Sequence, residues 1–132
     1  MKRIQRLIFS VILMTVSQFV VAEELIVEFK GTGNRTTATF EARGPWILDW
    51  RINSDYNKMV SFDLDLLNGS TGLLEGNILN LKVLEYGRNG VRMFNKSGKF
   101  RLRINGSLVD WQFKVKQLTR AEAELYTPRN PR

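Results

Sequence analysis

The sequence predicts an all-β fold: a single antiparallel β-sandwich of about seven to eight strands after an N-terminal signal peptide. Apolar and polar residues alternate with a period of two through most of the chain beyond residue 22, which is typical of strands with one buried face. Asn-Gly dipeptides, which favour tight hairpin turns, separate several of these runs. A helical period of 3.6 residues does not occur between the signal peptide and residue 118.

The first 22 residues have the layout of a secretory signal peptide. Lys2, Arg3 and Arg6 give a positive start, an apolar run covers residues 7–16, and small residues up to Ala22 offer a cleavage site. The apolar run is shorter than the ~20 residues of a membrane span, so cleavage is preferred to the alternative of an uncleaved anchor. We therefore expect an exported protein, periplasmic or extracellular, with no transmembrane span in the mature chain.

Cleavage after Ala22 leaves a length that suits one domain. The chain has no cysteine, which excludes disulfides, thiol catalysis and thiolate metal sites, so an apolar core or a bound partner must stabilise the fold. We expect the sandwich over residues 23–118, and a short helical turn with a flexible tail over 119–132. Thr119 and Glu122 have the spacing of a helix capping box.

Alternation of apolar and polar residues predicts the first five strands. In each strand the apolar residues occupy every second position. The runs cover residues 25–29, 38–42, 46–52, 60–66 and 79–83. Ile47 interrupts the polar phase of the third run. The phase slips near Leu84, which predicts a bulge or a turn there.

The strongest local prediction is a hairpin over residues 99–115 that turns at Asn105-Gly106. A two-residue loop pairs apolar with apolar residues and opposite charges with each other, each pair contributing about 0.2–1 kcal/mol. The predicted pairs are Leu102 with Val109, Phe100 with Trp111, and Arg101 with Asp110. Asn68-Gly69 and Asn89-Gly90 predict two further turns.

Charge is unevenly distributed after the signal peptide. Residues 23–81 hold 5 basic and 9 acidic side chains, whereas residues 82–132 hold 12 and 4. This asymmetry favours a basic surface that binds an anionic polysaccharide or lipid surface, although a merely solvated surface is the plainer alternative. Nucleic acid is not expected as a partner because the protein is predicted to be exported.

The hairpin prediction places four of these cations together. They point outward on its two strands and should share one sheet face: Arg101, Arg103, Lys114 and Lys116. Arg92 and Lys99 belong to the same basic segment. We predict that this face binds phosphates, sulfates or acidic sugars.

Aromatic residues near turns are candidates for stacking on sugar rings, whose flat C–H surfaces pack on exposed aromatic faces. The candidates are Trp46, which follows Gly44-Pro45 at a strand start, and Tyr56, Tyr86 and Phe94. Trp50 and Trp111 are in phase with core residues, so we expect both to be packed inside.

Two segments support a resemblance to a known group of proteins. Gly31 to Phe40, followed by Gly44 to Trp50, contains a Gly-x-Gly turn, a Thr-rich strand and a Trp-rich strand, and the chain ends on an alternating pair of strands, the second carrying Trp111. Over residues 25–118 this pattern resembles small exported bacterial domains that are largely uncharacterised. The resemblance implies a sandwich with a general likeness to carbohydrate-binding modules, and it brings no catalytic residues.

Catalysis and metal binding are not expected. The chain has no histidine or cysteine, so Ser/Cys–His arrangements and the usual zinc sites cannot be built. Asp63 and Asp65 share a face, as a glycosidase pair would, but they also fit the polar side of a strand. The loop 53–57 alternates oxygen ligands without the Gly and Glu of a calcium loop, although a structural calcium remains an alternative. No cofactor is predicted.

The sequence therefore predicts an exported, non-catalytic binding module for an anionic polymer or lipid head groups. A protein-interaction role, as an accessory subunit or an inhibitor in the cell envelope, is the alternative.

Overall fold

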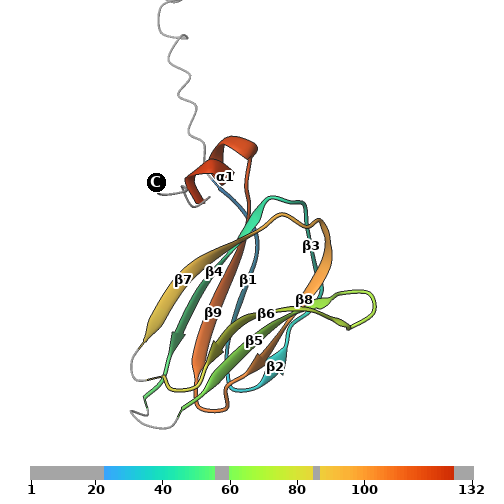
Figure 1. Cartoon of the computed structure of the whole chain (residues 1–132). Helices are drawn as coiled ribbons and strands as arrows, with labels where there is room; N and C mark the ends of the chain where they lie inside the picture. The colour runs from blue at the N-terminus through green and yellow to red at the C-terminus, as the bar shows by residue number, and fades with distance from the viewer. Residues whose placement is uncertain (1–22, 56–59, 85–86, 127–132) are drawn as a thin grey trace, which may run out of the picture.

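The computed structural model describes residues 23–55, 60–84 and 87–126, which form two antiparallel sheets packed face to face (Figure 1). The predicted all-β sandwich is confirmed. The signal peptide, the residues after 126, Tyr56 and Tyr86 lie outside the described residues. Within the described part, no helix is long and apolar enough to cross a membrane.

Sheet A has four strands in the order β1-β9-β4-β7: β1 (Glu24–Thr32), β9 (Asp110–Gln117), β4 (Trp46–Asn53) and β7 (Arg88–Phe94). Sheet B has five strands, in which both β2 and β3 pair with β8: β2 (Arg35–Thr36), β3 (Phe40–Ala42), β8 (Gly98–Asn105), β5 (Phe62–Asn68) and β6 (Leu74–Leu81). The strand count exceeds the prediction because the Thr-rich run divides into β2 and β3 (Figure 1).

The core lies between the sheets and consists of the apolar phase of the alternating strands, as the sequence predicts. Trp111 is buried and stacks on Phe113 with their ring centroids 5.2 Å apart, whereas Trp50 is half-buried at the edge of the core. Burying one such large side chain contributes about 1.5–3 kcal/mol. This core stabilises a cysteine-free domain without disulfides.

The predicted hairpin between β8 and β9 is wrong, because the chain crosses from sheet B to sheet A after Asn105. Phe100 and Leu102 pair with β5, and Trp111 pairs with β1 and β4. Both strands keep their apolar side toward the core, so the alternation is satisfied without any pairing between them. Arg101 consequently lies opposite Leu67 and not opposite Asp110.

The other two Asn-Gly signals have different outcomes. β5 and β6 do form a hairpin, but its loop is longer than two residues and the left-handed glycine is Gly72, with φ of 74°. Asn89-Gly90 lies inside β7 instead of forming a turn. Gly90 is required there because the Trp50 ring covers it: a Cβ atom would lie 2.5 Å from Trp50 Cζ2.

Helix α1 (Arg120–Tyr126) begins with the predicted capping box. The Thr119 N–H donates to Glu122 Oε1 at 2.9 Å, and the Glu122 N–H donates to Thr119 Oγ1 at 3.2 Å. These reciprocal bonds satisfy two donors of the first helical turn and fix the start of a helix that is too short to form alone.

Candidate functional site

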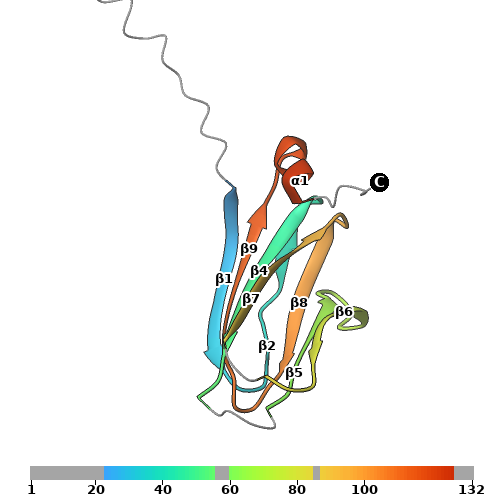
Figure 2. The ribbon, with the colours of Figure 1, turned by 60° about the vertical axis from the view of Figure 1, so that its left-hand side comes forward.

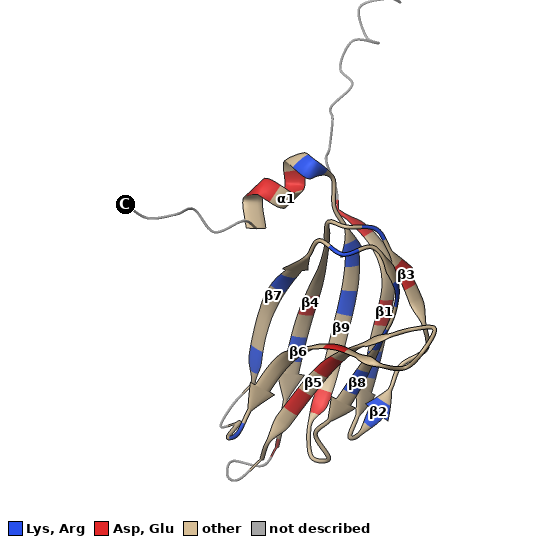
Figure 3. Cartoon of the chain, turned by 45° about the vertical axis from the view of Figure 1, so that its right-hand side comes forward, with Lys and Arg blue, Asp and Glu red and all other residues tan. Residues whose placement is uncertain are grey.

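The predicted basic face is not one surface, because its four residues lie on strands of different sheets. Arg101 and Arg103 belong to β8 in sheet B, whereas Lys114 and Lys116 belong to β9 in sheet A. Each pair points outward from its own sheet, so the two pairs lie on opposite faces of the sandwich. Figure 3 shows blue bands on both strands. The prediction of a single shared face is therefore wrong.

On sheet B, the Asp65 carboxylate neutralises the charge of Arg103, and an amide group holds this carboxylate in place. Its Nη2 donates to Asp65 Oδ2 at 2.8 Å, and Asn77 Nδ2 donates to both Asp65 Oδ1 and Asp63 Oδ1 at 2.8 Å. Burial tends to raise the pKa of Asp65, but the hydrogen bonds from Asn77 and Arg103 and the charge of Arg103 outweigh it, so this pKa lies below its usual value. Asp63 and Asp65 share a face, as predicted.

Arg101 and Lys99, the other outward cations of β8, make no ion pair among the described residues but have polar neighbours. Arg101 Nε donates to Thr39 Oγ1 at 2.9 Å, and Lys99 lies directly opposite Glu41 in the pairing of β3 with β8. The outer face of sheet B therefore carries balanced charges and offers little net attraction to an anion.

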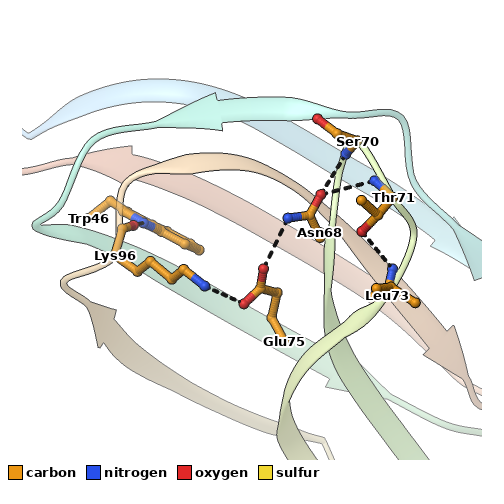
Figure 4. Close-up of polar contacts among 7 residues, drawn as sticks. All are labelled: Trp46, Asn68, Ser70, Thr71, Leu73, Glu75 and Lys96. Atoms are coloured by element: carbon orange, nitrogen blue, oxygen red, sulfur yellow. Dashed lines mark hydrogen bonds and ion pairs between the residues drawn. The ribbon is translucent and has the colours of Figure 1, made fainter.

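Lys96, another member of the basic segment, helps to close the β5–β6 hairpin (Figure 4). Its Nζ donates to Glu75 Oε2 at 2.5 Å, and Asn68 Nδ2 donates to Glu75 Oε1 at 3.2 Å. The hydrogen bonds from Lys96 and Asn68 and the Lys96 charge lower the pKa of Glu75. Asn68 Oδ1 also accepts the N–H groups of Ser70 and Thr71, which shapes the loop.

Trp46 belongs to the core, so its predicted rim position is wrong. The side chain is fully buried, and its Nε1 donates to the Lys96 carbonyl oxygen at 2.9 Å. One face of the ring stacks on Phe94 at a centroid distance of 4.4 Å, and Phe40 approaches it edge-on. Such a ring has no exposed face to offer a sugar.

Phe94 and Arg92 lie at the edge between the sheets. Phe94 is half-buried against Trp46, and the Arg92 guanidinium carbon lies 5.3 Å from its ring centroid. Arg92 Nη1 donates to the carbonyl oxygens of Asn77 and Ile78, both at 3.1 Å. Arg92 thus joins β7 of sheet A to β6 of sheet B and occupies carbonyl groups of that edge strand.

On the outer face of sheet A, Lys114 and Lys116 lie among acidic residues. Lys116 Nζ is 3.4 Å from Glu23 Oε2 and 3.8 Å from Asp49 Oδ2. Lys114 lies in register between Glu28 on β1 and Asp49 on β4. This half of the sheet A face is therefore also close to neutral.

On the other half of the outer face of sheet A, the cations lack close acidic partners. Lys30 on β1, Gln112 on β9 and Arg51 on β4 form one cross-strand row, which we call the Lys30–Gln112–Arg51 row. Two strand spacings place the backbones of Lys30 and Arg51 about 10 Å apart. Lys30 makes no ion pair or hydrogen bond within the described part of the chain, and Arg51 has only a 3.9 Å contact with Asp49.

An open depression of about 500 Å³ lies over this row and its neighbours. Thr32, Asp110 and Asn53 form the next outward row, and Thr32 Oγ1 donates to Asp110 Oδ1 at 2.6 Å. Ammonium, guanidinium, amide, hydroxyl and carboxylate groups thus line one shallow surface. Such a surface can bind an anionic group together with hydroxyl groups.

Lys30 and Arg51 are not among the binding residues that the sequence predicts. Alternation already put both on the polar side of their strands, beside Glu28 and Asp49, and so on an outer face. It did not show that β9 separates β1 from β4, and this pairing alone brings the two cations into one row. In the comparisons with known proteins, no family model and no curated protein matches this chain.

Proposed function

We propose that this protein is an exported, non-catalytic binding module for an anionic polysaccharide, and that the polymer binds across the Lys30–Gln112–Arg51 row of sheet A. The observation that carries this proposal is the row itself: two exposed cations, neither with a short ion pair to a described residue, flank an amide over an open depression. The cations would bind carboxylate or sulfate groups of the polymer.

The other groups of the depression suit a sugar chain. Thr32 Oγ1 donates to Asp110, so it can only accept from a sugar hydroxyl, whereas Asn53 can both donate and accept. Gln112 Nε2 already donates to Glu28 Oε1 at 2.6 Å and keeps one N–H and its carbonyl oxygen for a ligand, and Asp110 can accept. The depression is open, so a long polymer can continue past it in both directions. Such binding through exposed charges weakens with added salt.

Three features of the sequence support the rest of the proposal. The signal-peptide pattern of the first 22 residues supports export. The lack of histidine and cysteine supports a non-catalytic role. The resemblance to carbohydrate-binding-like exported domains supports a sugar polymer as the ligand class.

Electrophoresis through gels that contain polygalacturonate tests the proposal. We expect retardation at low salt, compared with a gel that contains neutral dextran. The double variant Lys30→Ala/Arg51→Ala should lose most of the retardation. Lys99→Ala/Arg101→Ala, which removes the same charge from sheet B, should keep it. If both double variants lose the same share of the retardation, binding depends only on net charge and not on the row. If the unmodified protein is not retarded by any acidic polysaccharide, the proposed function is wrong.

Lipid head groups are the other anionic ligand that the sequence suggests. Sedimentation with phosphatidylglycerol vesicles separates the two ligands. Binding to vesicles without retardation by any acidic polysaccharide would assign the same cations to a lipid surface instead.

A protein-interaction role is the second candidate, and the β5–β6 hairpin favours it. Leu73 and Leu74 are adjacent at this protruding hairpin and are 69% and 60% exposed (Figure 1). Exposed neighbouring leucines are unusual on a solvated surface and favour contact with a partner protein. Recovery of one stoichiometric partner at high salt, lost in Leu73→Ser/Leu74→Ser, would support this role over polymer binding.

A further inference from the structure

Helix α1 and the start of β1 line a cavity of about 520 Å³ at one end of the sandwich. The described residues that line it are Glu23, Ala121, Glu122 and Leu125. Figures 1 and 2 both show α1 at the end of the sandwich where β1 begins. Glu23 is also the first residue after the predicted cleavage site, so the cavity lies where a mature chain would begin.

Glu122 has a buried carboxylate oxygen with no partner. The residue is only 6% exposed, and its Oε1 accepts the Thr119 N–H of the capping box. Its Oε2 has no hydrogen-bond partner among the described residues. A buried carboxylate oxygen without a donor is costly, so the fold has a place for a cationic or N–H donor here.

Both acidic and basic groups lie around this position, and Arg43 and Arg120 line a neighbouring depression together with Glu122. Lys116 from β9 contacts Glu23 and Asp49, and the Tyr126 hydroxyl donates to Glu23 Oε1. The hydrogen bond to Glu23, burial and the charges of Glu23, Asp49 and Glu122 raise the pKa of Tyr126 to about 12. Lys116 thus pairs with two carboxylates, and no ion pair of Glu122 occurs among the described residues, so its Oε2 can still accept from a further cation.

We propose that cleavage of the signal peptide itself supplies this cation: the new α-ammonium group of Glu23 binds the Glu122 carboxylate and fastens helix α1 to the start of β1. Hydrolysis of the Ala22–Glu23 bond by a signal peptidase consumes one water and leaves a carboxylate on Ala22 and an ammonium group on Glu23. Before cleavage the same nitrogen is an uncharged amide. The proposal rests on the predicted cleavage site and is independent of polysaccharide binding.

The consequence is a mature domain that is more stable than its precursor. The α-ammonium group carries its charge below its ordinary pKa of about 7.7–8.0, and nearby carboxylates favour that charge. Before cleavage, Glu122 Oε2 lacks this ammonium partner. Cleavage then completes the hydrogen bonding of Glu122.

A double-mutant cycle tests the proposal. One protein starts at Glu23, released from a cleavable fusion that leaves no extra residue, and a second starts at Val21, which moves the ammonium group by about 7 Å. Each is made with Glu122 and with Glu122→Gln, since glutamine preserves the acceptor of the capping box and removes the charge. The protein that starts at Glu23 should have a melting temperature about 4–8 °C above that of the protein that starts at Val21, and Glu122→Gln should abolish this difference.

Glu124→Gln is the matched control, since Glu124 is exposed on the same helix. It should leave the difference between the two starts unchanged. Amide hydrogen exchange of residues 120–126 should be slower in the Glu23 start than in the Val21 start.

Four results would overturn the proposal. Equal melting temperatures for both starts would do so, as would a difference that persists in Glu122→Gln. Mass spectrometry that finds the exported chain beginning elsewhere than at Glu23 would remove its premise. Calcium that stabilises the Val21 start through Glu122 would place a metal ion in the cavity instead.

Discussion

The two outer faces of the sandwich carry similar numbers of charged side chains but match them differently. On sheet B, Arg103 and Asp65 are 2.8 Å apart and Asn77 binds the same carboxylate. On sheet A, Arg51 is 3.9 Å from its nearest carboxylate and Lys30 has no partner in the described part of the chain. Paired charges contribute to the stability of a face, whereas cations without a close partner remain available for a ligand.

The neighbours of each strand cause this difference. β8 lies between strands that carry acidic residues in register with its cations, as Asp65 is with Arg103 and Glu41 with Lys99. β9 presents Gln112, a neutral residue, between Lys30 and Arg51. The excess of basic residues in the second half of the chain therefore does not by itself locate a binding surface.

The largest expected effect is on the matched face. Asp65→Ala leaves Arg103 and Asn77 without their shared acceptor, so the free energy of unfolding should fall by about 1–3 kcal/mol. The lower part of this range is expected because the Arg103 side chain is 44% exposed and solvent screens the pair. Asp49→Ala on sheet A is the matched control and should cost less than about 1 kcal/mol. Equal losses in urea denaturation would contradict the comparison.

A decrease in pH should lower the stability of the folded protein by an intermediate amount, through protonation of Asp65. The pKa of Asp65 is below its ordinary 3.8 in the folded state, so the folded protein binds fewer protons there than the unfolded chain. The stability from Asp65 is complete above pH 3.8 and is lost as the pH falls through the lowered pKa. Urea midpoints at pH 7 and pH 3 should therefore differ less in Asp65→Asn than in the unmodified protein. The same difference in both proteins would argue against a lowered pKa.

The smallest effect on stability is expected on the unmatched face. Lys30→Ala/Arg51→Ala removes exposed side chains without short contacts, so the free energy of unfolding should change by less than about 0.5 kcal/mol. Urea denaturation of the samples used for gel retardation measures this change directly. A larger loss would mean that these cations hold the fold together and are not reserved for a ligand.

Much of the secondary structure was predictable because it depends on local pattern. The alternation of β1, β4 and β5 and the capping box at Thr119 and Glu122 use interactions between neighbouring residues. Trp46 was misplaced because proline and glycine before a strand suggest exposure, whereas stacking on Phe94 and contact with Phe40 bury it.

The Asn-Gly prediction at Asn105 failed for a different reason. The dipeptide permits a tight turn but does not require its flanking strands to pair with each other. Phe100 and Trp111 remain buried whether their strands pair or face one another across the core, because both arrangements keep the same alternation. The error carried into the candidate site, since the shared basic face depended on that hairpin.

The order of apolar and polar residues is enough to fix which side chains turn inward and where most strands lie, because burial of alternate residues is a local property of an extended chain. Which strands are neighbours could not be read from that order. That choice depends on contacts between distant segments, such as β9 between β1 and β4, and it alone places Lys30, Gln112 and Arg51 in one row and Glu122 beside Glu23.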